Sequence, residues 1–146
     1  MALINQGPDA ITVSLGEMVG LLKGRHRQLK AMLLDQKVVA GIGNIYADEI
    51  CHRAGIRPLK RADTLTKPAI ARLHDAMQSV LGAAIEARGS SLADEQYVDL
   101  FGRAGSYQHN HRVHARGGKP CWICGNPVVR VAWSGRSTYF CQTCQR

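Results

Sequence analysis

The stretch that decides the fold of the first two-thirds of the chain is Leu33-Leu-Asp-Gln-Lys37-Val-Val-Ala-Gly-Ile-Gly-Asn44-Ile-Tyr-Ala-Asp-Glu49. Gly41 and Gly43 interrupt a helical pattern and allow a positive φ or a close backbone approach. Asn44 is a favourable N-cap for a helix that ends at Ala54, and the two acids in its early turns suit the helix dipole. The stretch therefore predicts two helices joined by a glycine turn, with Gly55 ending the second one.

Capping residues and apolar spacing predict two further helices and the inward face of the helix before the glycine turn. Ser14 and Glu17 form a capping box, and apolar residues then recur at helical spacing: Leu15, Met18, Val19 and Leu22. The next helix should turn Leu29, Met32 and Leu33 inward and leave its basic residues on other faces: Arg25, Arg27 and Lys30. Thr66 caps the longest helix, which we expect to end near Arg88-Gly89 and to bury one stripe: Ile70, Leu73, Met77, Val80, Leu81 and Ile85.

Four cysteines at the end of the chain predict a zinc site. They form two Cys-x2-Cys pairs separated by sixteen residues: Cys121, Cys124, Cys141 and Cys144. Each pair wraps a tight turn, and two such turns complete a tetrahedron of thiolates around one Zn²⁺. A redox role is disfavoured because the sequence has no βαβ pattern. Four cysteines leave no open position for water, so the zinc should be structural and should supply most of the folding energy of the last 28 residues.

The remaining candidates near the zinc motif have plain structural interpretations. Alternating residues predict a β-hairpin that turns at Ser134-Gly135. Because the cysteines fill the coordination shell, three histidines are expected to be exposed loop residues: His109, His111 and His114. Cys51 is interpreted as a helix core residue. The fold class is thus mainly α with a small β-hairpin, with a helical domain over 1–105 and a loop and zinc finger over 106–146.

The charge distribution points to a polyanionic partner. Lys and Arg number 19 against 11 Asp and Glu, which gives +8 and a pI near 9.6. Residues 101–146 carry seven basic residues and no acid. Such clustering favours nucleic acid, although a basic surface kept for solubility remains an alternative. No long apolar run or export signal is visible, so we expect no membrane partner and a location in the cytoplasm at the nucleoid.

Two positions are candidates for phosphate contacts. The turn from Gly41 to Asn44 feeds a helix N-terminus, where free backbone amides can bind an anion. Arg136 lies at the tip of the predicted hairpin, where a rigid support would let it grip a phosphate. The alternatives are an ordinary interhelical turn and a solvated tip residue, and the residues alone leave them open.

The opening stretch and the ending Arg136-Ser-Thr-Tyr-Phe-Cys141-x2-Cys144-Gln145 together resemble the formamidopyrimidine-DNA glycosylase/endonuclease VIII family, from about residue 14 to 146. The resemblance implies a helix–two-turn–helix domain followed by a zinc finger. It implies that Asn44, with the amides of its turn at Gly43, holds phosphates beside a flipped-out lesion, and that Arg136 grips the same backbone. It places Lys30 near the lesion, Gly102 to Tyr107 in the segment that joins the helices to the finger, and a lid over 102–112.

The chain departs from the family pattern at its start. Family enzymes begin with a catalytic domain whose N-terminal proline attacks the sugar of the damaged nucleotide. This sequence begins Met1-Ala2-Leu3, and its nearest proline is Pro8. We therefore assign no catalytic residue. We expect a zinc-dependent binder of double-stranded DNA, including damaged or abasic DNA, without autonomous glycosylase activity.

Two alternatives remain open. One is residual glycosylase or abasic-site lyase activity, in which the α-amine of Ala2 or the side chain of Lys30 acts as the nucleophile. The other is half of a split or truncated repair enzyme, with a protein partner at the face left by the missing domain. An exposed apolar patch on residues 14–35 would favour the second.

Overall fold

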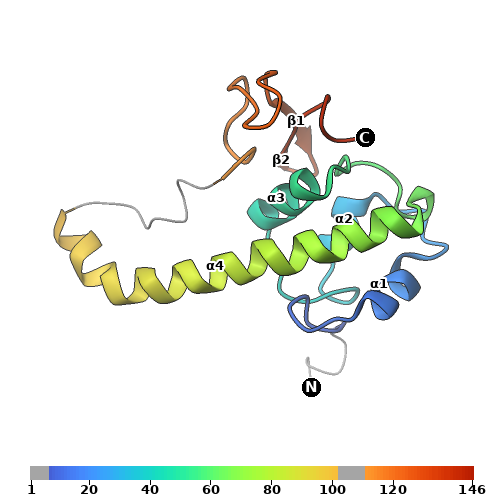
Figure 1. Cartoon of the computed structure of the whole chain (residues 1–146), viewed down its shortest axis with the longest axis horizontal. Helices are drawn as coiled ribbons and strands as arrows, with labels where there is room; N and C mark the ends of the chain where they lie inside the picture. The colour runs from blue at the N-terminus through green and yellow to red at the C-terminus, as the bar shows by residue number, and fades with distance from the viewer. Residues whose placement is uncertain (1–6, 102–110) are drawn as a thin grey trace.

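The computed structural model describes the backbone of residues 7–101 and 111–146. It describes the side chains of the same residues except those of 87–101. Helices fill the first part and a hairpin the second, which confirms the predicted fold class (Figure 1). The elements are α1 (Leu15–Leu22), α2 (Leu29–Leu34), α3 (Asn44–Ala54), the short 3-10 helix η2 (Ala62–Thr64), α4 (Lys67–Phe101), β1 (Val129–Trp133) and β2 (Arg136–Phe140). Within the described residues, no helix combines the length and the apolar character needed to cross a bilayer.

The helix ends follow local chemistry that the sequence predicts. The Ser14 hydroxyl accepts from the Glu17 amide and the Glu17 carboxylate accepts from the Ser14 amide, both at 3.1 Å, so the capping box of α1 is confirmed. Thr66 caps α4 by accepting from the Ala69 amide at 3.2 Å. Gly55 ends α3 with a left-handed φ of 73°.

The expected end of α4 near Arg88-Gly89 is wrong, because the helix continues to Phe101. A glycine inside a helix costs only about 1 kcal/mol relative to alanine, so Gly89 cannot stop a helix by itself. The predicted apolar stripe is buried except at Ile85, which is 55% exposed. The core contact of α4 therefore ends before Ile85, and Figure 1 shows the helix extending past the body of the molecule.

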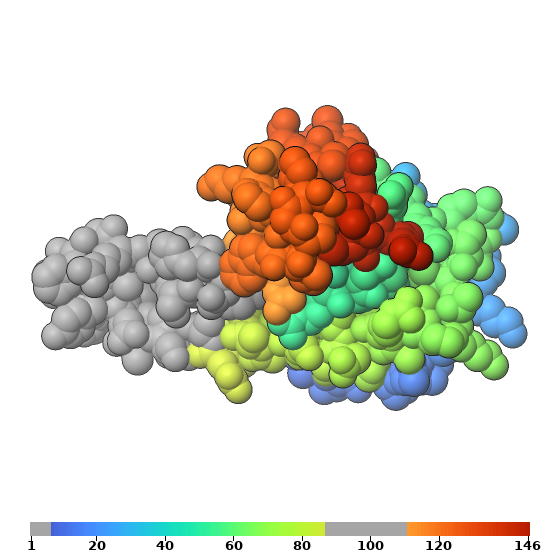
Figure 2. Space-filling view, turned by 45° about the horizontal axis from the view of Figure 1, so that its top comes forward, coloured from blue at the N-terminus to red at the C-terminus, as the bar shows by residue number. Residues whose placement is uncertain are grey.

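The hairpin forms as predicted and packs on α3. Val129 pairs with Phe140 and Trp133 with Arg136 in antiparallel register. Both residues between the strands have positive φ, 45° at Ser134 and 75° at Gly135, as a two-residue hairpin turn requires. The hairpin lies against the helical part rather than apart from it, with α3 beneath it (Figures 1 and 2).

Candidate zinc site and nucleic-acid interface

The four predicted cysteines converge on one point. Their sulfur atoms all lie within 4.8 Å of one another. Cys121 and Cys144 are 3.9 Å apart, and Cys124 and Cys141 are 3.5 Å apart. A tetrahedral zinc ion with bonds of about 2.3 Å requires sulfur separations of about 3.8 Å. The cluster therefore fits one structural Zn²⁺, as the spacing predicts.

Each Cys-x2-Cys turn directs a backbone amide at its first sulfur. The Ile123 amide donates to Cys121 and the Cys144 amide donates to Cys141, both at 3.4 Å. A backbone hydrogen bond at Asn126 lowers the pKa of the Cys124 thiol to about 7, whereas burial raises the pKa of Cys144 to about 12. Some of these thiols therefore lose their protons at neutral pH only when zinc binds. This couples zinc binding to proton release.

A histidine that sequence reasoning missed lies behind the zinc ligands. His52 of α3 is buried, and its Nε2 is 3.4 Å from the Cys121 sulfur. Burial lowers the pKa of His52, so the ring is neutral and can donate Nε2–H to a thiolate. Such outer contacts orient metal ligands. His52 therefore links the helical part directly to the predicted metal site.

The glycine turn and the start of α3 differ in detail from the expectation. Gly43, not Asn44, is the N-cap, and no side chain caps the first amides of α3. Gly41 has φ +102°, which only glycine adopts readily, whereas Gly43 has φ −94° and nothing within 4 Å of an added Cβ. Gly43 is exposed, so the space in front of the uncapped amides is open to an anion.

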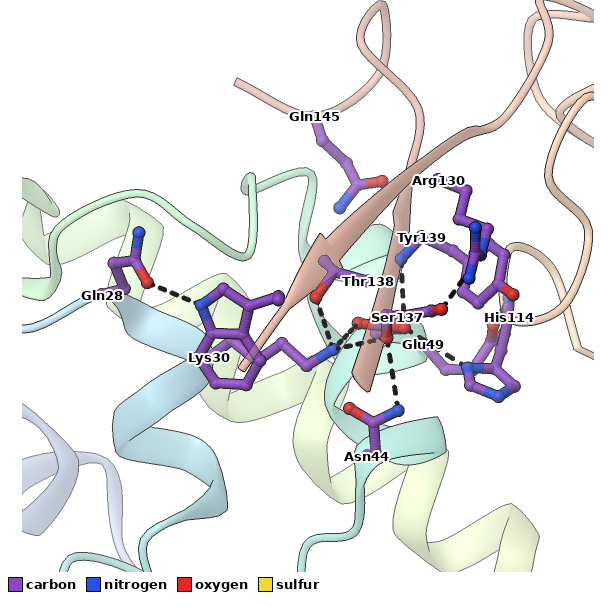
Figure 3. A network of polar contacts seen from close by, with 12 residues as sticks. Gln28, Lys30, Asn44, Glu49, His114, Arg130, Ser137, Thr138, Tyr139 and Gln145 are labelled. Carbon is purple, nitrogen blue, oxygen red and sulfur yellow. Dashed lines mark hydrogen bonds and ion pairs between the residues drawn. The ribbon is translucent and has the colours of Figure 1, made fainter. Parts of the chain in front are cut away.

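Asn44 reaches the finger instead of capping its helix. Its Nδ2 donates to the Ser137 carbonyl at 3.3 Å, and its Oδ1 is buried without a hydrogen-bond partner among the described residues. Ser137 follows Arg136, whose side chain is exposed at the start of β2. The structure thus brings the two predicted phosphate-contact regions together through one carbonyl (Figure 3).

The expectation that Lys30 lies on a face other than the buried one is wrong. Its side chain is fully buried, and its ammonium forms an ion pair with Asp48 Oδ1 at 2.9 Å. The same nitrogen donates to Thr138 Oγ1 at 2.7 Å and to the Ser137 carbonyl at 3.2 Å. It also lies 5.1 Å from the centre of the Trp133 ring. A direct contact between Lys30 and DNA, as predicted, would require the side chain to leave this cluster.

The two acids of α3, Asp48 and Glu49, hold the finger rather than serving the helix dipole. Asp48 Oδ2 accepts from the Tyr139 amide at 3.2 Å and lies 3.3 Å from His114 Nδ1. Glu49 accepts three consecutive backbone amides of residues 112–114, at 2.6, 3.0 and 2.9 Å. Charge-assisted bonds of this kind are about twice as strong as neutral ones. Both acids are buried, so they serve to fix the finger on α3 (Figure 3).

The C-terminal end of the finger is fixed to the residues after α3. The Gln145 side chain donates to the Ile56 carbonyl at 2.9 Å and accepts from the Cys141 amide at 2.7 Å. Arg57 donates to the carbonyl of Gln145 at 3.0 Å. Both ends of the finger are thus bound to α3 or its C-terminal loop.

The structure confirms the expectation for Cys51 but not the expectation for two of the three histidines. Cys51 is a fully buried core residue, as expected. The expectation that His111 and His114 are exposed is wrong, because both are half-buried and His114 packs edge-on against Tyr139. His109, the joining segment from Gly102 to Tyr107 and all but the last two residues of the 102–112 lid lie outside the described residues.

Two family models match most of the chain. Residues 6–96 match the "Formamidopyrimidine-DNA glycosylase H2TH domain", and residues 118–146 match the "Zinc finger found in FPG and IleRS". The formamidopyrimidine-DNA glycosylase of Nitratidesulfovibrio vulgaris is 46% identical over 140 residues, which cover 96% of this chain and 38% of that protein. The Thermus thermophilus enzyme of the same name is 44% identical, covering 98% and 54%. The chain thus spans about half the length, or less, of these curated relatives.

Solved structures agree with the sequence comparisons. The crystal structure of the Thermus thermophilus MutM (Fpg) protein matches with a TM-score of 0.84 and 43% identity, covering 98% of this chain and 55% of that one. A complex of Lactococcus lactis Fpg with DNA that contains FAPY-dG matches with a TM-score of 0.84 and 31% identity, covering 99% and 52%. Another complex holds the Lactococcus lactis protein on DNA with an abasic site, with a TM-score of 0.85 and 30% identity, covering 99% and 53%.

Proposed function

The chain belongs to the formamidopyrimidine-DNA glycosylase/endonuclease VIII family. We propose that it is a zinc-dependent module that binds the backbone of double-stranded DNA in DNA repair. Its phosphate-contacting residues, Gly43, Asn44 and Arg136, are called the grip below. The observation that carries the proposal is the bond from Asn44 to the carbonyl of Ser137, 93 positions later in the chain. Because Arg136 directly precedes Ser137, this bond supports a location of the exposed Arg136 near the start of α3. On this proposal the two separate motifs present their phosphate-binding groups on one surface.

The grip combines three kinds of donor. The α3 amides at Gly43 and beyond supply dipoles, the Arg136 guanidinium supplies a full charge, and Asn44 supplies a neutral amide beside them. Asn44 Oδ1, buried without a partner among the described residues, can accept from an ordered water. Contacts of this kind position a protein on DNA without reading base sequence. The binding should therefore depend little on sequence.

The buried charges act as positioning residues in this proposal. Lys30 holds the Ser137 carbonyl and Thr138, Asp48 holds Lys30 and the Tyr139 amide, and Glu49 holds residues 112–114. Zinc, held by the four cysteines, stabilises the same finger. Loss of any of these contacts should weaken DNA binding by misplacing Arg136.

We further propose that the DNA is damaged or abasic, and that these 146 residues bind it without excising a base. Support for the lesion comes from the Lactococcus lactis structures, whose ligands are FAPY-dG and abasic-site DNA. Lys30 is a poor amine for a lyase reaction, because its nitrogen is buried and already bonded to Asp48, Thr138 and the Ser137 carbonyl. The large apolar residues exposed within the described part include only Leu15 from residues 14–35, which gives little support to a partner on that face.

Fluorescence anisotropy with a labelled duplex that carries one abasic-site analogue tests the proposal. Asn44→Ala should weaken binding by about 1–2 kcal/mol, as loss of a polar contact commonly does. Zinc removal with a chelator should abolish binding. Lys119→Gln, which removes one finger charge away from the grip, is the matched control and should change the affinity much less. Unchanged binding by the chelated protein would contradict the proposal.

A further inference from the structure

A cavity of about 620 Å³ lies where the end of the finger meets the loop after α3. Its volume is in the range of small-molecule sites. It shares no residue with the grip formed by Gly43, Asn44 and Arg136. Its lining consists of Arg57, Pro58, Leu59, Lys60, Phe140 and Arg146, which we name the Phe140 pocket. Figure 2 shows the last residues of the finger lying beside the segment that follows α3.

The charge of the Phe140 pocket is unbalanced. Three of its six lining residues are basic and none is acidic: Arg57, Lys60 and Arg146. Among the described residues, none of the three forms a salt bridge, whereas nearby Arg61 is paired with Asp63 at 2.6 Å. Like charges gathered around one hollow repel one another. An anionic ligand would relieve that repulsion.

One cation of the pocket is held in place before any ligand arrives. The Arg57 Nε donates to the Gln145 carbonyl at 3.0 Å, and its Nη2 donates to the Gln142 carbonyl at 3.1 Å. These bonds leave Nη1 and one hydrogen of Nη2 for a ligand. The guanidinium carbon lies 5.9 Å from the centre of the Phe140 ring. A fixed guanidinium loses little freedom on binding a phosphate.

The other walls of the pocket are apolar. Pro58 is buried, Phe140 is 9% exposed, and Leu59 is half-buried. A fixed cation, two further cations and an aromatic wall suit a ligand that joins an anion to a flat ring. Bases commonly stack on aromatic side chains and arginine planes, while basic residues bind their phosphates.

We propose that the Phe140 pocket binds a nucleoside monophosphate group, either a free nucleotide or the phosphorylated end of a nucleic-acid strand. Arg57, Lys60 and Arg146 hold the phosphate, and the base lies against Phe140 and Leu59. This site is separate from the proposed DNA grip and does not depend on it.

Titration of the zinc-loaded chain with dAMP, followed by amide NMR shifts, tests the proposal. The amides of Leu59, Lys60 and Phe140 should shift saturably. Lys60→Gln, whose side chain makes no hydrogen bond or ion pair in the described structure, should weaken dAMP about tenfold. Lys119→Gln, which removes a charge elsewhere on the finger, should change the affinity less than about twofold.

Further ligands separate the sources and the alternatives. Deoxyadenosine and inorganic phosphate should each bind more weakly than dAMP. A short duplex that shifts the pocket amides only when it carries a 5′-phosphate, without an effect of dAMP, would support a strand end as the source. The proposal is overturned if neither dAMP nor the phosphorylated duplex shifts Leu59, Lys60 and Phe140. It is also overturned if inorganic phosphate binds as tightly as the ligand that shifts these amides, or if Lys60→Gln leaves the affinity for that ligand unchanged.

Discussion

Replacement of Glu49 by Gln removes the contact that most directly holds the finger on α3. The Glu49 carboxylate is 4% exposed and accepts from three amides, one through Oε1 and two through Oε2. Glutamine keeps the shape but has a single oxygen. In either orientation its NH₂ group faces at least one amide donor, so at least one bond is lost and the others become neutral.

The magnitude follows from the bond types. A hydrogen bond to a charged group contributes about 1.5–3 kcal/mol and a neutral one about 0.5–1.5 kcal/mol. One lost bond contributes about 1.5–3 kcal/mol and two weakened ones about 2–3 kcal/mol, so the sum is about 3.5–6 kcal/mol. For a chain of this size that is a fall in Tm of about 10–20 °C.

Thermal unfolding of the zinc-loaded protein measures the effect, with zinc content and duplex affinity measured on the same samples. We expect Glu49→Gln to keep the four-cysteine zinc site but to lose DNA affinity, because an undocked finger misplaces Arg136. Glu86→Gln, an exposed change on α4, is the control for loss of one negative charge. Equal Tm and equal DNA affinity for the two variants would refute the reasoning.

Three further perturbations test other parts of the account. Gly41→Ala should destabilise the fold by about 1–2 kcal/mol, because its φ of +102° is strained for alanine. Gly43→Ala should change stability by less than about 0.5 kcal/mol but should weaken DNA binding. Urea unfolding measures the stability of both variants, and fluorescence anisotropy measures their DNA binding. Lys30→Met should cost about 3–5 kcal/mol by leaving Asp48 unpaired, and the double change with Asp48→Asn should cost less than the two single changes added together. Zinc affinity should fall with falling pH across the neutral range, because zinc must displace the proton of Cys144, and it should fall more steeply below about 7, where the Cys124 thiol also regains its proton. A competing chromogenic chelator would report this, and a pH-independent affinity would contradict it.

The features predictable from the sequence are those fixed by neighbouring residues. The capping box at Ser14, the hairpin turn at Ser134 and the spacing of the four cysteines all act within a few positions of the chain or through a known ligand geometry. The end of α4 is not predictable from Gly89, because a glycine penalty of about 1 kcal/mol is small against the rest of a long helix.

The charged residues of the interface could not be placed from local patterns. Lys30 contacts Thr138 across 108 positions, and Glu49 contacts residues 112–114 across more than 60. A helical wheel treats such residues as solvent-facing, because their partners come from a finger that docks only in the folded state. One signal was present: Asp48 and Glu49 lie between Ala47 and Ile50, which are buried. Adjacent acids among core positions need partners, and those partners can be distant amides.

The salt dependence of duplex binding, compared between the natural chain and Arg136→Gln, tests the central claim most directly. If Arg136 neutralises one phosphate beside the α3 amides, its loss should lower the slope of log K against log salt by about 0.9 in magnitude. It should also weaken binding by about 1.5–3 kcal/mol. An unchanged slope and affinity, with the finger still loaded with zinc, would contradict the claim that the hairpin and α3 form one phosphate grip.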